Sequence, residues 1–150
     1  MAELVDLSRI CAQAEVSGWK DAVSKAGSLL VETGDIEESY IENMIASVEE
    51  LGPYMVIAKG FALAHAAPCE AVKRNAVSLI NLKEGVDFGS ANDPVKVVMC
   101  LACTDRESHI GNLSKIAMRL MEKDMIEKLS LCQSDEELYE TINGNKEDQE

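Results

Sequence analysis

The sequence predicts an α/β domain in which a mixed β-sheet is flanked by helices on both faces. Amphipathic helical patterns come first, short apolar runs fill the middle of the chain, and one run passes directly into another helical pattern. In that run the residues that would point to either face of a strand are apolar, as expected of a strand with helices above and below it. The length of 150 residues leaves room for one sizeable core, so residues 1–150 are expected to form a single domain.

Two helices are expected in the first third of the chain. Over residues 17–33 the apolar side chains recur at three- and four-residue steps, and a glycine follows as a stop signal. Asp35 is expected to cap a second helix over residues 36–50, which ends at the breaker Gly52-Pro53. Both helices therefore precede the central segment.

The central segment is expected to form strands joined by turns. Short apolar runs cover residues 54–58, Phe61–Ala64 and 76–82, with glycine, proline and charged residues between them. The richest run, Val95–Ala102, is interrupted only by Lys96. It is therefore expected to be the central strand.

Helices are expected again after this strand. One should begin near Ser108, where apolar residues return at helical spacing. Further helices are expected over Met125–Leu131 and residues 135–142. The polar residues 143–150 are expected to be a frayed tail.

The charge balance restricts the class of partner. The chain has 14 Lys and Arg against 27 Asp and Glu, a formal net charge of −13. Nucleic acids and anionic lipids are recognised by basic faces, so protein partners or small ligands are expected instead. No apolar run approaches the roughly 20 residues of a membrane-spanning helix, so no membrane insertion is expected. The odd number of cysteines, 5, and the lack of a secretory signal pattern favour a reducing cytoplasm.

Cys100 and Cys103 have the spacing of a redox or zinc motif, but they lie in extended chain at the end of the predicted central strand. In an extended strand residues three apart point to opposite faces, and a zinc site also needs a second pair of ligands. Both thiols are therefore expected to be buried and inert. No metal and no other cofactor is expected.

The two histidines are the main candidates for chemistry, although a structural role is the common alternative for any single histidine. Small residues flank His65, and they would leave a ring nitrogen open to a large partner. His109 lies at the expected first turn of a helix, where backbone N–H groups and the helix dipole favour an anion. A phosphoryl group on a nearby histidine is one such anion.

The segment over residues 51–68, LGPYMVIAKGFALAHAAP, resembles a known active-site signature. It is similar to that of the EIIA components of bacterial phosphoenolpyruvate-dependent sugar phosphotransferase systems (PTS), in the mannitol/fructose superfamily, or EIIA type-2. The Gly-Pro-Tyr run is most similar to the ascorbate-type branch. Stretches over residues 19–31, 92–96 and 108–117 agree in the same order. The resemblance implies a mannitol-EIIA-like mixed sheet of about five strands with helices on both faces.

The resemblance also implies a phosphocarrier. His65 would accept a phosphoryl group from the phosphohistidine of the carrier protein HPr and pass it to a cysteine of EIIB, with the membrane component EIIC involved indirectly. The transported substrate would be ascorbate or a related sugar or polyol. His109 corresponds to the second histidine that holds the phosphoryl group. Weaker candidates for supporting this group are Lys59, Thr104, Arg106 and Ser108.

Three departures from the family pattern lead to an alternative. Ala64 stands where relatives have proline before the active histidine, Ala67 stands where they have arginine, and no arginine lies between Arg9 and Arg74. A regulatory EIIA-like binding module not coupled to a permease is therefore the competing hypothesis, and a redox protein using the two strand cysteines is a third. The identity of the sugar and the oligomeric state, including a homo-oligomer, stay open.

Overall fold

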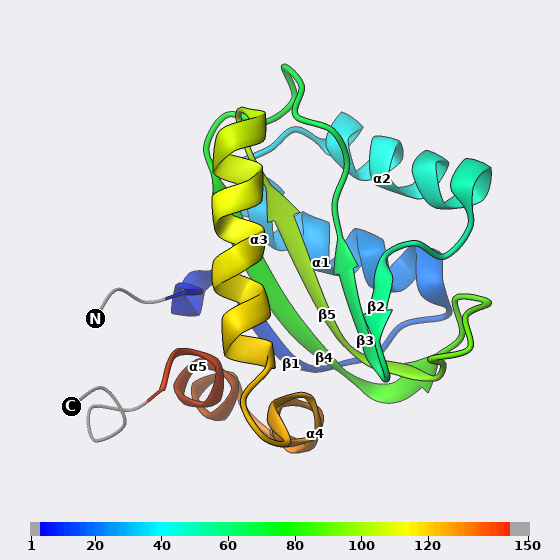
Figure 1. The fold of residues 1–150 in the computed structure, drawn as a ribbon, viewed down its shortest axis with the longest axis vertical. Helices are drawn as coiled ribbons and strands as arrows, with labels where there is room; N and C mark the ends of the chain where they lie inside the picture. The colour runs from blue at the N-terminus through cyan, green and yellow to red at the C-terminus, as the bar shows by residue number, and fades with distance from the viewer. Residues whose placement is uncertain (1–3, 145–150) are drawn as a thin grey trace.

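The computed structural model describes residues 4–144 and contains one five-stranded sheet in the order β1-β4-β5-β3-β2 (Figure 1). The pairs β1/β4 and β3/β5 are parallel, and the pairs β4/β5 and β2/β3 are antiparallel. The strands are β1 (Ile10–Ala14), β2 (Val56–Ala58), β3 (Phe61–Ala64), β4 (Ala76–Val86) and β5 (Val95–Ala102). The prediction of a mixed α/β sheet is confirmed.

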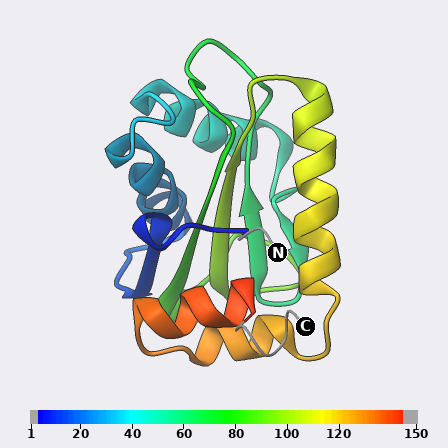
Figure 2. The same ribbon diagram turned by 90° about the vertical axis from the view of Figure 1, so that its left-hand side faces the viewer.

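Helices cover both faces of this sheet, as the view along its edge shows (Figure 2). On one face lie α1 (Trp19–Glu32) and α2 (Glu38–Leu51). On the other lie α3 (Arg106–Leu120), α4 (Met125–Leu131) and α5 (Asp135–Asn143). A short 3-10 turn, η1 (Leu7–Arg9), precedes β1.

The central strand β5 belongs to both hydrophobic cores. Successive side chains of a strand point to opposite faces. Accordingly Val98 and Cys100 pack in the core under α1 and α2, whereas Met99 and Leu101 pack in the core under α3, α4 and α5. Every residue of β5 except Lys96 is buried. This two-sided burial is the reason that its sequence is an almost continuous apolar run.

Most predicted elements agree with the structure, with differences at their ends. The strand expected over residues 76–82 continues to Val86, and the strand expected over 54–58 begins only at Val56. The helix expected near Ser108 starts at Arg106, with Asp105 as its N-cap. Strand β1 was not predicted from the sequence. It is irregular, because its register shifts between Cys11 and Ala14 and Gln13 has φ 56°.

Asp35 does not cap α2, contrary to the prediction; the N-cap is Glu37, whose side chain makes no cap hydrogen bond. The Asp35 side chain is buried and accepts hydrogen bonds from Arg9 Nε at 2.7 Å, Arg74 Nε at 2.9 Å and Thr33 Oγ1 at 2.5 Å. Burial raises the pKa of this carboxyl, but the hydrogen bonds from Arg9, Thr33 and Arg74 bring the net shift below its ordinary value. Asp35 thus joins η1, the end of α1 and the loop before β4.

The expected tail does not begin at Asn143, because this residue ends α5 and is buried. Its side-chain oxygen accepts from the N–H groups of Leu4 and Val5 at 2.6 and 2.9 Å, and its amide nitrogen donates to the Val5 carbonyl at 2.8 Å. A segment near the chain start is thus tied to the last helix. Residues 145–150 of the expected tail lie outside the described residues.

The structure agrees with the expectation for the strand cysteines. Cys100 and Cys103 are buried free thiols in different cores, and burial raises the pKa of Cys100 to about 12. Met118 and Met121 are exposed on and just after α3. Between residues 4 and 144, no helix combines the length and the hydropathy needed to cross a bilayer.

The Asp35→Asn variant should have a free energy of unfolding about 2 kcal/mol lower than that of wild type at pH 7. The amide lacks the negative charge that Arg9 and Arg74 contact, and its N–H group would face hydrogen-bond donors instead of accepting from them. Folding lowers the pKa of Asp35, so its contribution is complete above the unfolded value of about 3.9 and is lost as the pH falls through the folded value. The difference between the two proteins should therefore shrink below about pH 4.

Urea unfolding of both proteins between pH 3 and pH 7 measures this difference. The matched control is Glu15→Gln, which removes an exposed carboxylate 3.2 Å from Lys83 Nζ. Exposed pairs contribute little, so this control should change the free energy of unfolding by less than about 1 kcal/mol. Equal effects of the two substitutions would contradict the structural role given to Asp35.

Candidate active site

The topology of the sheet brings His65 and His109 together. His65 directly follows β3, which is parallel to β5 with Ala64 opposite Cys100, so both strands end at the same edge of the sheet. The chain then passes from β5 through a short connection into α3, whose first turn carries His109. The two imidazole ring centroids lie 5.4 Å apart, with the ring planes tilted by 51°. The histidine pair expected from the sequence is therefore close in space.

A backbone hydrogen bond sets the tautomer of His65. Its Nδ1 lies 2.7 Å from the carbonyl oxygen of Leu63. A carbonyl oxygen only accepts hydrogen bonds, so Nδ1 must carry the proton. In the neutral ring this leaves the lone pair on Nε2. Of the two ring nitrogens of His65, Nε2 is therefore the one with a lone pair available for nucleophilic attack.

The surroundings of His65 favour its neutral form. Burial lowers the pKa of the imidazole, the hydrogen bond to the Leu63 carbonyl raises it, and proximity to His109 lowers it, with a net shift below the ordinary value. The ring is therefore mostly uncharged at pH 7. A neutral imidazole with a free lone pair is competent for attack on phosphorus.

His109 has a buried ring nitrogen without a partner. Within residues 4–144, its Nδ1 makes no hydrogen bond although it is shielded from solvent. A buried N–H without an acceptor is rarely tolerated in proteins. Of the two neutral tautomers, the one with its proton on Nε2 fits these surroundings better, and an Nε2–H is a donor suited to an anionic oxygen.

Two tyrosine hydroxyls hold the segment that carries His65. The buried Tyr40 hydroxyl lies 2.8 Å from the Leu101 carbonyl and accepts from the Ala66 N–H at 2.9 Å. Burial raises the pKa of Tyr40, so its hydroxyl stays neutral. The Tyr54 hydroxyl donates to the His65 carbonyl at 2.8 Å. Sequence analysis did not identify either tyrosine, because both lay within predicted apolar patterns and their hydroxyl partners are distant in sequence.

Lys59 is not brought to the histidine pair. It lies in the turn between β2 and β3, at the opposite end of β3 from His65. At about 3.3 Å per residue, the strand separates the two backbones by roughly 15–20 Å. The structure therefore removes Lys59 from the candidate site.

The other weaker candidates lie at the start of α3, where Asp105 uses the available donors. The Ser108 N–H donates to Asp105 Oδ1 at 2.7 Å, and the His109 N–H donates to the Asp105 carbonyl at 3.1 Å. The hydrogen bonds from the backbone and hydroxyl of Ser108 lower the pKa of Asp105. Thr104 Oγ1 donates to Asn75 Oδ1 at 3.2 Å, and Arg106 is exposed. The expected role of these first-turn N–H groups as free phosphate donors is therefore not supported by their geometry.

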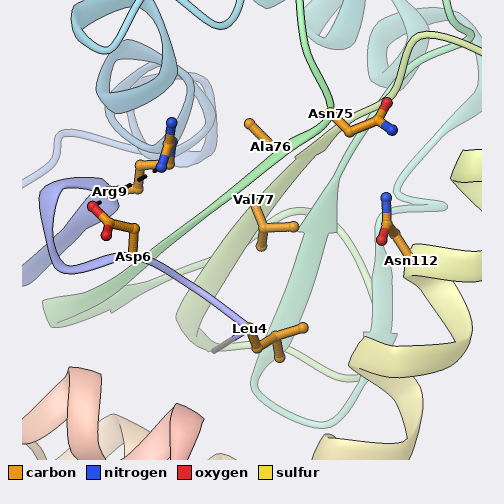
Figure 3. A pocket seen from close by; sticks show the side chains of 7 residues that line it. All are labelled: Leu4, Asp6, Arg9, Asn75, Ala76, Val77 and Asn112. Atoms are coloured by element: carbon orange, nitrogen blue, oxygen red, sulfur yellow. Dashed lines mark ion pairs between the residues drawn. The ribbon is translucent and has the colours of Figure 1, made fainter. Parts of the chain in front are cut away.

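A cavity of about 240 Å³ lies beside α3, between the chain start and the beginning of β4 (Figure 3). Asn112 lies one turn beyond His109 on α3, and its amide donates to Cys103 Sγ at 3.5 Å. Neither histidine lines the cavity. Its lining residues are Leu4, Asp6, Arg9, Asn75, Ala76, Val77 and Asn112.

The mixed five-stranded sheet between helical layers is the fold of the mannitol-type EIIA proteins. The solution structure of the mannitol-specific cryptic phosphotransferase enzyme IIA CmtB from Escherichia coli matches with a TM-score of 0.86 and 28% identity, covering 95% of this chain and 97% of that chain. Enzyme IIAMTL of Escherichia coli, solved in complex with phosphorylated enzyme IIBMTL, shares the fold with a TM-score of 0.81 and 24% identity, covering 94% of this chain and 98% of that chain.

Sequence comparison makes the assignment more specific. The family model for the phosphoenolpyruvate-dependent sugar phosphotransferase system, EIIA 2, matches residues 3–145. The ascorbate-specific PTS system EIIA component of Escherichia coli strain K12 is 32% identical over 142 residues, covering 93% of this chain and 92% of the relative. The chain belongs to the EIIA 2 family of the phosphoenolpyruvate-dependent sugar phosphotransferase system.

The pKa of the His65 ring should lie below about 6.5, the ordinary value for histidine, and should rise in a His109→Ala variant because one lowering influence is removed. An NMR titration of the ring signals measures both values. Because folding lowers this pKa, protonation of His65 should disfavour the folded state as the pH falls below about 6.5. A His65 pKa above about 6.5 in wild type would contradict the predicted effect of burial and of His109 on this ring.

Proposed function

We propose that this protein is the EIIA phosphocarrier of a sugar-uptake system and that His65 is its phosphorylated residue. The observation that carries the proposal is the hydrogen bond from His65 Nδ1 to the Leu63 carbonyl, which leaves Nε2 as the nucleophile. His109 lies across from this ring and offers the second imidazole. Membership of the EIIA 2 family gives the reaction class, phosphotransfer within the PTS.

Acceptance of the phosphoryl group proceeds by in-line displacement. The lone pair of His65 Nε2 attacks the phosphorus of phospho-HPr, a new P–N bond forms, and the P–N bond to the HPr imidazole breaks. The leaving imidazole keeps the electron pair of that bond. The proton on His65 Nδ1 remains shared with the Leu63 carbonyl throughout. His109 Nε2–H stabilises an equatorial oxygen of the transferring group.

Donation to EIIB is the reverse displacement with a different nucleophile. A cysteine thiolate of EIIB attacks phosphorus, a P–S bond forms, and the bond to His65 Nε2 breaks with its electron pair returning to the ring. The phosphorylated ring is a good leaving group because Nδ1 still carries its proton, so the ring departs as a neutral imidazole. The complex of enzyme IIAMTL with phosphorylated enzyme IIBMTL, which shares the fold, supports EIIB as the partner.

The names of the relatives support the substrate class that we propose. The sequence relatives at 32% identity are named ascorbate-specific, which supports uptake of ascorbate or a related sugar or polyol. In this scheme the EIIA chain handles only phosphate and proteins, in the cytoplasm, as a single domain over residues 1–150. The net charge of −13 suits brief docking against carriers whose active sites are basic.

His65→Ala should abolish phosphorylation, because the substitution removes the nitrogen that attacks phosphorus in the proposed transfer step. The measurement is labelling of the purified protein with radioactive phosphoenolpyruvate in the presence of enzyme I and HPr. His109→Ala should still be labelled, but more slowly, since it loses only a donor to the phosphoryl oxygens. Undiminished labelling of His65→Ala would reject the site.

The competing function is that of a regulatory EIIA-like module, and Ala64 and Ala67 are the observations that favour it. Transfer of phosphate from the labelled protein to EIIB distinguishes the two functions. If the protein is a transport phosphocarrier, labelled protein mixed with an ascorbate-type EIIB should lose its phosphate to the EIIB cysteine, and a Cys→Ala variant of that EIIB should receive none. Protein that is labelled on His65 but retains the phosphate with EIIB would support the regulatory function instead.

A further inference from the structure

The backbone of His65 lies beyond the support of the sheet. Ala64 is the last residue of β3 and pairs with Cys100 of β5, so the ladder ends one residue before the histidine. The residues that follow His65 form no regular element until β4 begins at Ala76. A nucleophile at the start of such a segment needs other contacts to keep its ring in one orientation.

Tyr54 contacts both the backbone and the ring of His65. Its hydroxyl donates to the His65 carbonyl at 2.8 Å. The two rings meet edge to face, with centroids 5.3 Å apart and an interplanar angle of 90°. This is a favourable geometry for paired aromatic rings. The tyrosine therefore restrains the position of the peptide and the plane of the imidazole together.

Tyr54 is itself held by the neighbouring helix. The Ser47 hydroxyl on α2 interacts with the Tyr54 phenol and lowers its pKa, although burial makes the net shift upward. The Tyr54 N–H also donates to the Gly52 carbonyl at 2.8 Å. A short chain of contacts thus runs from α2 through Tyr54 to His65.

The orientation that Tyr54 enforces is the one that keeps Nε2 available. The bond from His65 Nδ1 to the Leu63 carbonyl forms only when the imidazole lies in the observed plane. The Tyr54 ring contacts the imidazole in the perpendicular arrangement, so rotation of the imidazole would disturb this contact as well as the hydrogen bond. Loss of the tyrosine should therefore allow the His65 ring to reorient and should reduce the preference for its Nδ1–H tautomer.

We infer that Tyr54 is a positioning residue for phosphotransfer, which holds His65 in the Nδ1–H tautomer with Nε2 directed at the incoming phosphorus. This inference rests on the proposed function of His65. Tyr54 takes no part in bond making, and its hydroxyl keeps its proton while it donates to the His65 carbonyl. Its contribution is to the rate of transfer rather than to the docking of the donor protein.

The test uses Tyr54→Phe, which removes the hydroxyl and keeps the ring, and Tyr54→Leu, which removes both contacts. The first readout is the ¹⁵N NMR spectrum of the unphosphorylated protein, which reports the tautomer of His65 directly. Wild type should show a predominant Nδ1–H form. This population should fall in Tyr54→Phe and fall further in Tyr54→Leu.

The second readout is the kinetics of phosphate acceptance from phospho-HPr. Tyr54→Phe and Tyr54→Leu should lower kcat by roughly 10- to 100-fold, with KM nearly unchanged, because only alignment is lost. The matched control is Tyr139→Phe, which removes a phenol hydroxyl on α5 and should leave both readouts at wild-type values. Ser47→Ala leaves Tyr54 intact and should lower the population of the Nδ1–H tautomer of His65 by less than the tyrosine variants do. It replaces them in the test if they do not fold.

The two readouts separate this inference from the proposed function. A shifted tautomer in the Tyr54 variants supports the positioning role even if wild-type protein accepts no phosphate from HPr, an outcome that would reject the proposed function alone. A wild-type tautomer in both Tyr54 variants, or in Ser47→Ala when the tyrosine variants are unfolded, would overturn the positioning role. An unchanged kcat together with efficient wild-type transfer would overturn it as well.

Discussion

The parallel pairing of β3 with β5 is the constraint on which the candidate site depends. It aligns Ala64 with Cys100, so the two chains leave the sheet at the same edge. One chain continues into His65 and the other into the first turn of α3 with His109. Both strands are buried on both faces, so the pairing is stabilised by two hydrophobic cores at once. A shift of register between these strands would separate the two imidazoles.

The chemistry of the site is defined mainly by backbone groups. The Leu63 carbonyl selects the tautomer of His65, and the His65 carbonyl receives the hydroxyl of Tyr54. The Ala66 N–H donates to Tyr40. Small side chains at residues 64, 66 and 67 are compatible with this arrangement, because the contacts that hold the histidine come from the backbone and from two tyrosines. None of these contacts involves the side chain of Ala64 or Ala67.

The features that sequence analysis found are those with a local signal. The two-sided apolar run of β5, the amphipathic helices and the small residues around His65 can all be read within short windows. The features it missed depend on distant partners: Gln13 of the irregular β1 donates to Asn81 of β4, and Asp35 binds Arg9 and Arg74. Lys59 is close to His65 in sequence but lies at the opposite end of β3, because each residue of a strand adds about 3.3 Å of separation.

Asp105 at the start of α3 has a consequence for selectivity. The N-terminus of a helix beside a histidine is ordinarily a binding site for inorganic phosphate, which is abundant in cells. Here a carboxylate of the chain itself occupies the donors of the first turn. Together with the strongly acidic composition, this leaves little standing attraction for a free anion. In the proposed function, weak binding of dissolved phosphate would leave His65 accessible to a phosphoryl group delivered by a protein.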